Sequence, residues 1–541
     1  MKRTSLDNAG VAERLEAFAA LLELADASPY TSRAYRRAAE TIRATRAPIV
    51  ELVRERRDQE LRGIGPGISA RLRELVETGA IAELDELERT VRPELVGLGR
   101  FLGLQPKRMI ELAAALDVNT VDEFREAVLG GRLHDVRGIG PVTEQKLRER
   151  LEPERAVQRR GLTLDRAWAL VGEIAEALGG EIAGDPRRWA DVCTELAVVV
   201  PTTQPARKIS AFEQLSPIVV LVERGERRAV GVTVDGIAVE LLLPHPRRFG
   251  TDLVTATGTS AYVEALGPLP AAQDEAALYA ALGVPWCPPE LREQPFRGTP
   301  PPLVELEQVR GDLHCHTTWS DGKASVLEMG LAARARGYEY IAVCDHTKNV
   351  RVVPGLDADD IRRQGEEIAS ANEQLAQFRI LRGAEVDIRS DGSLDLPDDV
   401  LAELDWVQLS LHAGQRERRE TLTRKVAEAM RHPAVSCLSH PFGRLVNYRP
   451  PNALDLEAVI EVALETGVAL ETNGLPNRLD LCGSDVRLAV EAGVPIVAST
   501  DAHSVPGLGN MQLAVGTVRR GFATPADIVN TRRLAELLRS T

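Results

Sequence analysis

Two histidines lie two residues apart in the stretch Gly311-Asp312-Leu313-His314-Cys315-His316. Side chains at positions i and i+2 of a β-strand point to the same face. His314 and His316 can therefore reach one metal ion from a single rigid strand. This spacing predicts a strand whose carboxyl end carries metal ligands, and the residues that follow extend the pattern.

Residues 310–541 alternate strand-like and helical segments. The strand-like pieces include Tyr340-Ile341-Ala342-Val343, Trp406-Val407-Gln408-Leu409-Ser410 and Val468-Ala469-Leu470, and helical stretches of ten or more residues separate them. Repeated βα units predict an α/β barrel with its chemistry at the carboxyl ends of the strands.

Six of the nine histidines fall at these apparent strand ends, and three carboxylates accompany them. A single histidine in such a barrel is more often structural than a ligand, but a cluster at successive strand ends favours a metal site. Imidazole mixed with carboxylate suits Zn²⁺ or Mn²⁺, and a bridging acid allows neighbouring ions. The candidate ligands are His314, His316, Asp321, His346, Glu385, His412, His440, Asp501 and His503.

These residues resemble the polymerase and histidinol phosphatase (PHP) domain, a distorted TIM-like barrel with a trinuclear metal centre. The resemblance implies that His314, His316, Glu385 and Asp501 hold one ion, that Glu385, His412 and His440 hold a second, and that Asp321, His346 and His503 hold a third. It also implies phosphoester hydrolysis, with His440 and Asp501 as catalytic residues. Arg444 is a candidate phosphate clamp, and the alternative is that it is an ordinary surface arginine.

The first 155 residues predict helices throughout, with apolar residues at three-and-four spacing. Two segments, Leu61-Arg62-Gly63-Ile64-Gly65-Pro66-Gly67 and Val136-Arg137-Gly138-Ile139-Gly140-Pro141-Val142, share one pattern and each leads into a helix. They resemble helix-hairpin-helix elements, whose helix N-terminus offers backbone amides to a DNA phosphate regardless of sequence. The predicted DNA-binding residues are Gly63, Gly65, Gly67, Gly138, Gly140 and Val142.

The whole chain resembles bacterial family X DNA polymerases that carry a C-terminal PHP domain. The resemblance rests further on Arg33-Ala34-Tyr35-Arg36-Arg37-Ala38-Ala39 and on Pro288-Pro289-Glu290-Leu291-Arg292-Glu293. Between the helical region and the barrel, strand-like runs and a few helices predict an α+β unit, which the resemblance implies is a palm and a thumb. The expected parts are a helical lyase-type domain (1–90), fingers (91–157), a palm (158–245), a thumb (246–292), a proline-rich linker (293–309) and the PHP barrel (310–541).

The palm departs from the family pattern. Its three metal-binding aspartates align with Glu195, Ala197 and Glu240, and its phosphate-binding Gly-Ser motif aligns with Gly184-Asp185. Alanine coordinates nothing, a glutamate displaces its carboxylate, and Asp185 would repel a triphosphate. Arg188, which contacts the triphosphate in the family, is retained, so these changes predict weak or absent nucleotidyl transfer.

The lysine that a second activity of the family requires is absent from this chain. The lyase of some relatives uses a lysine Schiff base, and Arg71 occupies that position here. An arginine keeps its proton and cannot form the imine, so a lysine-type lyase is not expected.

Charge and composition limit the class of protein and the compartment in which we expect it. The net charge is −14, but residues 1–155 hold 26 Lys and Arg against 27 Asp and Glu, so −13 lies in the remainder. No apolar run approaches the length of a membrane span, and the N-terminus has no signal-like apolar segment. The six scattered cysteines lack a CxxC pair. We expect a reduced, cytoplasmic and nucleoid-associated monomer.

Three functions remain open. The first is a DNA-repair nuclease that removes 3′ ends of gapped, nicked or abasic DNA with two or three Mn²⁺ or Zn²⁺ ions in the barrel. The second is a gap-filling polymerase that uses dNTPs and Mg²⁺ or Mn²⁺ in the palm, with the PHP domain proofreading. The third is a small-molecule phosphatase. The paired hairpins argue against the third, and Ala197 and Asp185 argue against the second, so the sequence favours the nuclease.

Overall fold

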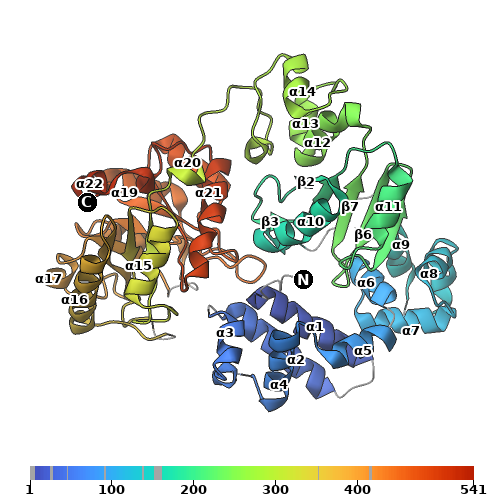
Figure 1. Ribbon diagram of the computed structural model, residues 1–541, viewed down its shortest axis with the longest axis horizontal. Helices are drawn as coiled ribbons and strands as arrows, with labels where there is room; N and C mark the ends of the chain where they lie inside the picture. Colours follow the sequence, from blue (N-terminus) through green and yellow to red (C-terminus); the bar gives the residue numbers. More distant parts are fainter. Residues whose placement is uncertain are drawn as a thin grey trace.

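The computed structural model describes residues 7–24, 29–45, 47–61, 63–90, 93–136, 139–151, 161–350, 353–412 and 417–540. A helical region comes first, then a mixed sheet with its helices, then a small helical cluster, and finally a barrel (Figure 1). This order agrees with the predicted fold class. Among the described residues, no helix is both long and apolar enough to cross a lipid bilayer.

The helical region packs around two separate cores. In the first, Val11, Leu15 and Phe18 recur on one face of a helix, and the ring of Phe18 meets that of Tyr35 edge-on at 4.8 Å. In the second, the fully buried Phe124 anchors the later helices. The helices are α1 (Asn8–Leu24), α2 (Pro29–Ala44), α3 (Ile49–Arg54), α4 (Pro66–Thr78), α5 (Ala82–Thr90), α6 (Pro93–Phe101), α7 (Pro106–Leu116), α8 (Val121–Leu129) and α9 (Pro141–Leu151).

The mixed-sheet region has strand order β2-β4-β7-β6-β5 in the described residues. Strands β4 and β7 are parallel and the other neighbours are antiparallel. The turn at Asp235-Gly236 joins β6 to β7, and Gly236 has the positive φ of +77° that such a turn requires. The elements are β1 (Leu162–Thr163), α10 (Leu164–Leu178), β2 (Glu181–Gly184), β3 (Val192–Cys193), β4 (Leu196–Val199), α11 (Pro205–Glu213), β5 (Val220–Arg224), β6 (Arg228–Val232) and β7 (Ala238–Leu242).

A small helical cluster follows, formed by α12 (Phe249–Thr257), α13 (Ser260–Leu266) and α14 (Glu275–Leu282). Its core contains Tyr262 and Tyr279, whose hydroxyl groups lie 2.7 Å apart. Glu275 at the start of α14 accepts hydrogen bonds from the fully buried Arg292 and from Arg187 of the mixed-sheet region, both at 2.6 Å. This ion cluster fastens the two regions together.

The barrel contains seven parallel strands within the described residues, in the order β8 to β14. A bridge between Cys315 and Ala502 connects the two edges, with His316 N donating to Ala502 O at 2.8 Å, so the sheet nearly closes. The strands are β8 (Gly311–Cys315), β9 (Tyr340–Val343), β10 (Arg379–Asp387), β11 (Trp406–Ser410), β12 (Cys437–Leu438), β13 (Ala469–Asn473) and β14 (Ile496–Ser499). The helices are α15 (Val326–Ala335), α16 (Ala358–Gln374), α17 (Asp398–Leu401), α18 (Arg419–Met430), α19 (Leu456–Thr466), α20 (Gly483–Ala492), α21 (Met511–Arg520) and α22 (Leu534–Ser540).

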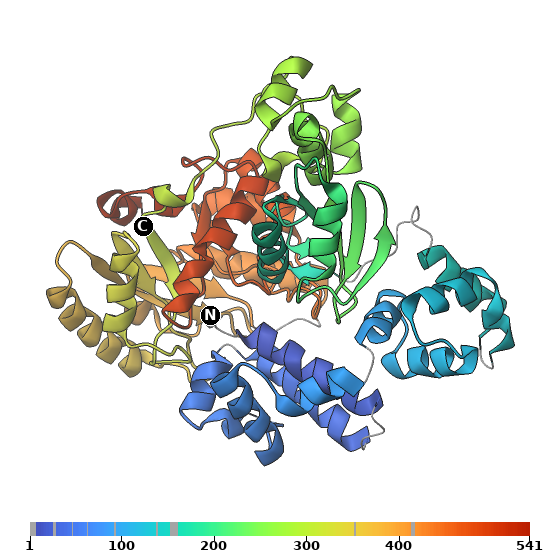
Figure 2. The same ribbon diagram turned by 45° about the vertical axis from the view of Figure 1, so that its right-hand side comes forward.

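The barrel docks directly against the mixed-sheet region, and Figure 2 shows the red barrel helices beside the green sheet. Leu479 and Leu513 of the barrel belong to the apolar core of the mixed-sheet region. Asp191, just before β3, pairs with Arg444 and Arg520 of the barrel, each at 2.6 Å. The position of the barrel rim that carries the candidate ligands is therefore fixed relative to the sheet.

The proline-rich segment, which the sequence predicts as a linker, is packed against its neighbours in the structure. Val304 is fully buried in the barrel core, and its backbone N–H donates to the carbonyl of Ala523 at 3.0 Å. Leu303 and Val309 are buried as well. Val304 and Val309 pack into the barrel core and Leu303 packs into the core of the small helical cluster, so the segment after the prolines is held between the two.

Candidate metal centre

Each candidate ligand of the barrel lies at or after the carboxyl end of a strand, or on the loop that follows it. His314 is in β8 and Glu385 in β10, while His412, His440 and Asp501 follow β11, β12 and β14 by two residues each. His316 and Asp321 follow β8, His346 follows β9, and His503 follows β14. All nine predicted ligands converge on one rim, as the βα alternation predicted.

The first group of ligand atoms surrounds His316. Its Nε2 lies 3.2 Å from Nε2 of His314 and 3.0 Å from Oδ1 of Asp501. The carboxylate of Glu385 is 3.5 Å from both imidazoles. These four side chains are almost completely buried. They are the residues that the PHP resemblance assigned to one ion.

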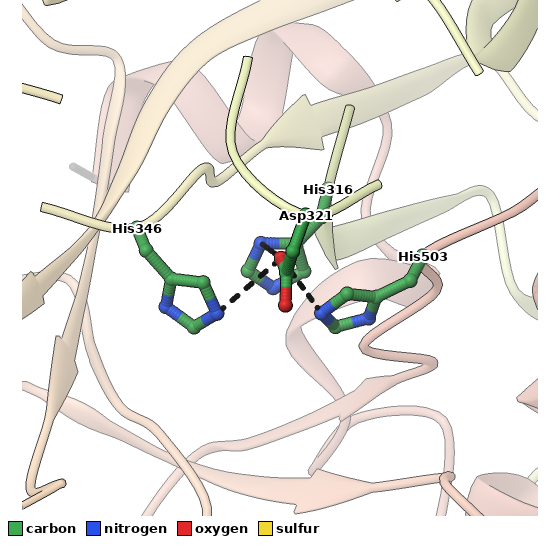
Figure 3. A group of neighbouring side chains, drawn as sticks. All are labelled: His316, Asp321, His346 and His503. Carbon is green, nitrogen blue, oxygen red and sulfur yellow. Dashed lines mark ion pairs between the residues drawn. The ribbon is translucent and has the colours of Figure 1, made fainter. Parts of the chain in front are cut away.

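The second group places Asp321 among imidazoles (Figure 3). Oδ1 of Asp321 is 3.2 Å from Nε2 of His503 and 3.6 Å from Nε2 of His346. His316 also faces this group, with its Nδ1 4.0 Å from the same oxygen. His316 is thus shared between the first two groups.

The third group gathers around Glu385. Its Oε1 lies 3.0 Å from Nε2 of His440 and 3.3 Å from Nε2 of His412, and its Oε2 lies 2.7 Å from Nδ1 of His346. Of these residues, His346, Glu385 and His412 have ligand atoms that all lie close enough together to hold one metal ion. His346 therefore faces two groups, whereas the resemblance assigned it to one ion only.

The chemistry of this donor set fits divalent cations. Nitrogen lone pairs and carboxylate oxygens point at one another at 3–4 Å, and Oε2 of Glu385 and Oδ1 of Asp501 accept no hydrogen bond from the described residues. Burial acts to lower the pKa of His412, but Glu385 and then Asp387 outweigh it and raise the pKa to about 9. The carboxylates thus attract positive charge, which a bound cation would supply.

Backbone strain coincides with the site. His440 and Asp501 have positive φ angles of 24° and 50°, a region that residues with side chains seldom adopt. Such conformations persist where surrounding contacts impose them, and they concentrate at functional sites. Here Oε2 of Glu471 accepts from His440 N at 2.7 Å, and Nδ2 of Asn473 donates to Asp501 at 2.9 Å.

Sequence reasoning missed the residues behind the ligands. Oε1 of Glu471 lies 2.6 Å from Nδ1 of His314, which leaves Nε2 of that imidazole for the rim. Asp387 contacts Nδ1 of His412 at 3.3 Å, and Asp345 accepts from the backbone N–H of Thr317 at 2.8 Å. Carboxylates of this kind fix the tautomer and direction of a ligand. A signal was available, because Glu471 directly follows the apolar run Val468-Ala469-Leu470 that the sequence predicts as a strand.

Arg444 does not point into the rim. Its Nη2 donates to Asp191 at 2.6 Å and its Nε to the backbone carbonyl of Arg478 at 2.8 Å. The arginine beside the ligands is instead Arg478, which is almost completely buried with Nε 3.9 Å from Oδ2 of Asp501. Burial and then the charge of Arg478 lower the pKa of His440 to about 4. Arg444 is therefore a support for the loop that carries Arg478.

The palm motif residues are engaged in internal contacts. Glu240 pairs with Arg228 on the neighbouring strand, and Oε2 of Glu195 lies 3.4 Å from Nη2 of Arg188. Ala197 is buried on β4 directly opposite Glu240. Within the described residues, the clusters able to hold a metal lie in the barrel, and none includes these positions.

Asp185 differs from the expectation that it would face a triphosphate. Its carboxylate is buried and accepts hydrogen bonds from the backbone amides of Thr194 and Glu195 at 2.6 and 2.7 Å. It also pairs with Arg188, whose side chain is only 5% exposed. Asp185 thus stands where the family has its phosphate-binding serine, but its carboxylate binds the loop at Thr194 and Glu195 and also holds Arg188.

The two predicted hairpins leave their glycines open to approach. Gly63 has φ of +91°, and an added Cβ at Gly63, Gly65, Gly67 or Gly140 would meet nothing within 4 Å. Helices α4 and α9 begin at the proline after Gly65 and Gly140, and Val142 is 69% exposed. Gly138 lies outside the described residues. Arg71 in α4 pairs with Glu74 at 3.0 Å.

Comparison with known proteins agrees with this arrangement. A helix-hairpin-helix domain model matches residues 6–81. The DNA polymerase/3'-5' exonuclease PolX of Bacillus subtilis (strain 168) is 30% identical over 558 aligned residues, covering 97% of each protein. A probable phosphatase of Syntrophotalea carbinolica is 29% identical over 230 residues, which cover 40% of this chain and 90% of that protein. A probable phosphatase of Acetivibrio thermocellus is 30% identical over 201 residues, covering 36% and 78%.

The phosphatase matches correspond to the barrel part of the chain. The match to PolX spans the helical region, the mixed sheet and the barrel together. With the fold in the same order, the chain belongs to the bacterial family X DNA polymerases that carry a C-terminal PHP domain.

Proposed function

We propose that this protein is a DNA-repair nuclease whose barrel hydrolyses phosphodiesters at 3′ ends of DNA, with Mn²⁺ or Zn²⁺ as its cations. The observation that carries the proposal is the convergence of nine imidazole and carboxylate side chains on one rim, all of them buried except the half-buried Asp321 and His412. The Bacillus relative, named a polymerase and 3'-5' exonuclease, supports DNA as the substrate.

The roles of the chain's own residues follow from the geometry. Bound cations would supply a hydroxide nucleophile at neutral pH and stabilise charge on the phosphate oxygens. We assign them to the three groups around His316, Asp321 and Glu385. Glu471 and Asp387 hold the ligand imidazoles in place, and Arg478 contacts a non-bridging phosphate oxygen beside Asp501.

The helical region would hold DNA without reading its sequence. The amides at the starts of α4 and α9, behind the open loops at Gly65 and Gly140, would bind phosphates. We propose gapped or nicked DNA as the substrate. We also propose that the protein is monomeric and cytoplasmic, where its six free cysteines would stay reduced.

Polymerase activity is the second candidate, and the name of the Bacillus relative favours it. Against it, Glu240 and Glu195 face arginines, and Ala197 offers no ligand. We therefore propose that nucleotidyl transfer is weak or absent. Similarity to the probable phosphatases supports hydrolysis at the barrel. A small-molecule phosphatase, however, would have no use for the two DNA-binding hairpins.

The test is incubation with 5′-labelled gapped DNA and Mn²⁺, with and without dNTPs. Products shorter than the primer indicate nuclease activity, and longer products indicate polymerase activity. His440→Ala and Asp501→Ala should abolish shortening while DNA binding persists. Glu195→Ala, a palm variant with an exposed side chain, should change the nuclease rate little. Normal shortening by the two barrel variants would show that the site is misassigned.

A further inference from the structure

A cleft of about 390 Å³ lies where the mixed-sheet region meets the barrel. Trp168 of α10 and Trp189 line it from the sheet side, and Pro476, Pro506 and Leu513 line it from the barrel side. Its volume falls within the range of about 300–1,000 Å³ that is typical of small-ligand sites. No motif from the sequence points to this cleft.

The barrel wall of the cleft continues into the metal centre. Pro476 precedes Arg478 by two residues, and Pro506 follows His503 by three. Gly507, which also lines the cleft, lies against Ala502, because an added Cβ would stand 3.2 Å from the Ala502 Cβ. Ala502 separates two predicted ligands. A ligand in the cleft would therefore lie beside the rim where the phosphate is cleaved.

The two indoles form a rigid aromatic wall. Their ring centroids are 4.8 Å apart, and Nε1 of Trp168 donates to the carbonyl of Pro186 at 2.7 Å. Trp168 still leaves 36% of its surface exposed. Trp189 is held from behind, since it packs against Gly516 of α21. An exposed tryptophan that is fixed in place can stack on a flat ring without a large loss of conformational entropy.

The charges of the cleft select the part of DNA that it can hold. Its lining includes the carboxylates of Asp7 and Asp165 but, among the described residues, no lysine or arginine. The buried Oδ1 of Asp165 accepts no hydrogen bond from the described residues. A phosphate would be repelled here, whereas a nucleobase offers N–H donors to the carboxylates and a flat face to the indoles.

We propose that this cleft binds the unpaired 3′-terminal base of a DNA strand while the adjoining phosphodiester lies at the metal rim. The inference rests on the proposed nuclease function and extends it. It makes the protein selective for ends whose last base is unpaired, because a paired base cannot leave the duplex without the cost of unstacking. Sequence preference would be slight, since every base has an aromatic face.

The experiment compares kcat/KM for two 5′-labelled primers in Mn²⁺, both with one unpaired 3′-terminal residue. One ends in thymidine and the other in a tetrahydrofuran abasic analogue. The wild-type protein should prefer the thymidine end by about tenfold, the effect of one stacked base. Trp168→Ala should bring this ratio close to one, and Trp168→Phe should retain part of it. Trp286→Ala, an exposed tryptophan outside the cleft, serves as the control.

The ratio separates the possible outcomes. A structural defect would slow both substrates equally and leave the ratio at its wild-type value, which would overturn the assignment of Trp168. Equal cleavage of both primers by the wild-type protein would overturn the base cleft alone. Failure to cleave either primer, together with no hydrolysis of the small diester bis(p-nitrophenyl) phosphate, would instead refute the nuclease function.

Discussion

The indole of Trp189 packs against the backbone of Gly516, so that a Cβ at that glycine would stand 2.2 Å from Cε3. This contact joins the mixed-sheet region to α21 of the barrel. The contact leaves no room for a side chain at position 516 of α21. Together with the ion pairs of Asp191, this close contact sets the orientation of the barrel rim relative to the sheet.

Gly516→Ala should weaken this docking by about 1–3 kcal/mol, the usual cost of an added group in a packed site. The barrel and the sheet should then separate more readily, and small-angle scattering should show a larger radius of gyration. Gly172→Ala is the matched control, because this glycine is also helical but a Cβ there would meet nothing within 4 Å. An unchanged radius for both variants would mean that Trp189 moves aside.

Arg478→Ala should lower kcat of the nuclease by about 100-fold, in line with the loss of one charged donor to a transition state. KM should change little. Added guanidinium ion should restore part of the rate, because it can occupy the space of the lost side chain. Arg444→Ala is the comparison, since Arg444 pairs with Asp191 and supports the same loop through a backbone carbonyl. If guanidinium ion restored the rate of Arg444→Ala but not that of Arg478→Ala, Arg444 would be the residue that contacts the phosphate and Arg478 the one that supports the loop.

The sequence was sufficient to bring the candidate ligands of the barrel together, but not to identify the residues around them. His314 and His316 are two apart on one strand, and this local spacing already places both on the same face. Arg444 and Arg478 cannot be separated in this way, because both follow the strands at similar distances. Only the packing of the barrel against Asp191 shows which one turns away from the rim.

For the same reason, the sequence could not predict the contacts of Asp185 in the palm or the existence of the cleft. That Asp185 departs from the family is visible in the sequence, but its hydrogen bonds to Thr194 and Glu195 depend on how the loop folds back. The cleft needs two regions that lie far apart in the chain. Trp168 and Pro506 line one cleft only because the barrel docks on the sheet, so no local pattern could have predicted it.

Glu275 should give the protein a defined loss of stability in acid. Burial acts to raise its pKa, but hydrogen bonds from Arg292 and then Arg187 outweigh it and lower the pKa from 4.5 to about 2. A pKa that is lower in the folded state stabilises the protein at pH values above the unfolded pKa. This stabilisation is lost as pH falls through the folded pKa. A shift of this size corresponds to about 3 kcal/mol, of which about 2 kcal/mol should be gone by pH 3.

The measurement is denaturant unfolding of the wild-type protein and Glu275→Gln between pH 6 and pH 3. The stability difference between them should shrink as the pH falls. Glu461→Gln, on the exposed face of α19, controls for the loss of one carboxylate. A difference that stays constant with pH would mean that the two arginines do not act on the charge of Glu275.

Asp185→Ser would restore the family's phosphate-binding residue, yet it should destabilise the protein. The carboxylate of Asp185 accepts two backbone amides and the Arg188 guanidinium, and hydrogen bonds to a charged group contribute about 1.5–3 kcal/mol each. Denaturant unfolding should show a loss in that range. Asp398→Ser, at a carboxylate that is 94% exposed, should change stability by less than about 0.5 kcal/mol. Primer extension by Asp185→Ser should remain at the wild-type level, because Ala197 still provides no ligand. Faster extension with unchanged stability would show that Asp185 had been blocking a competent polymerase site.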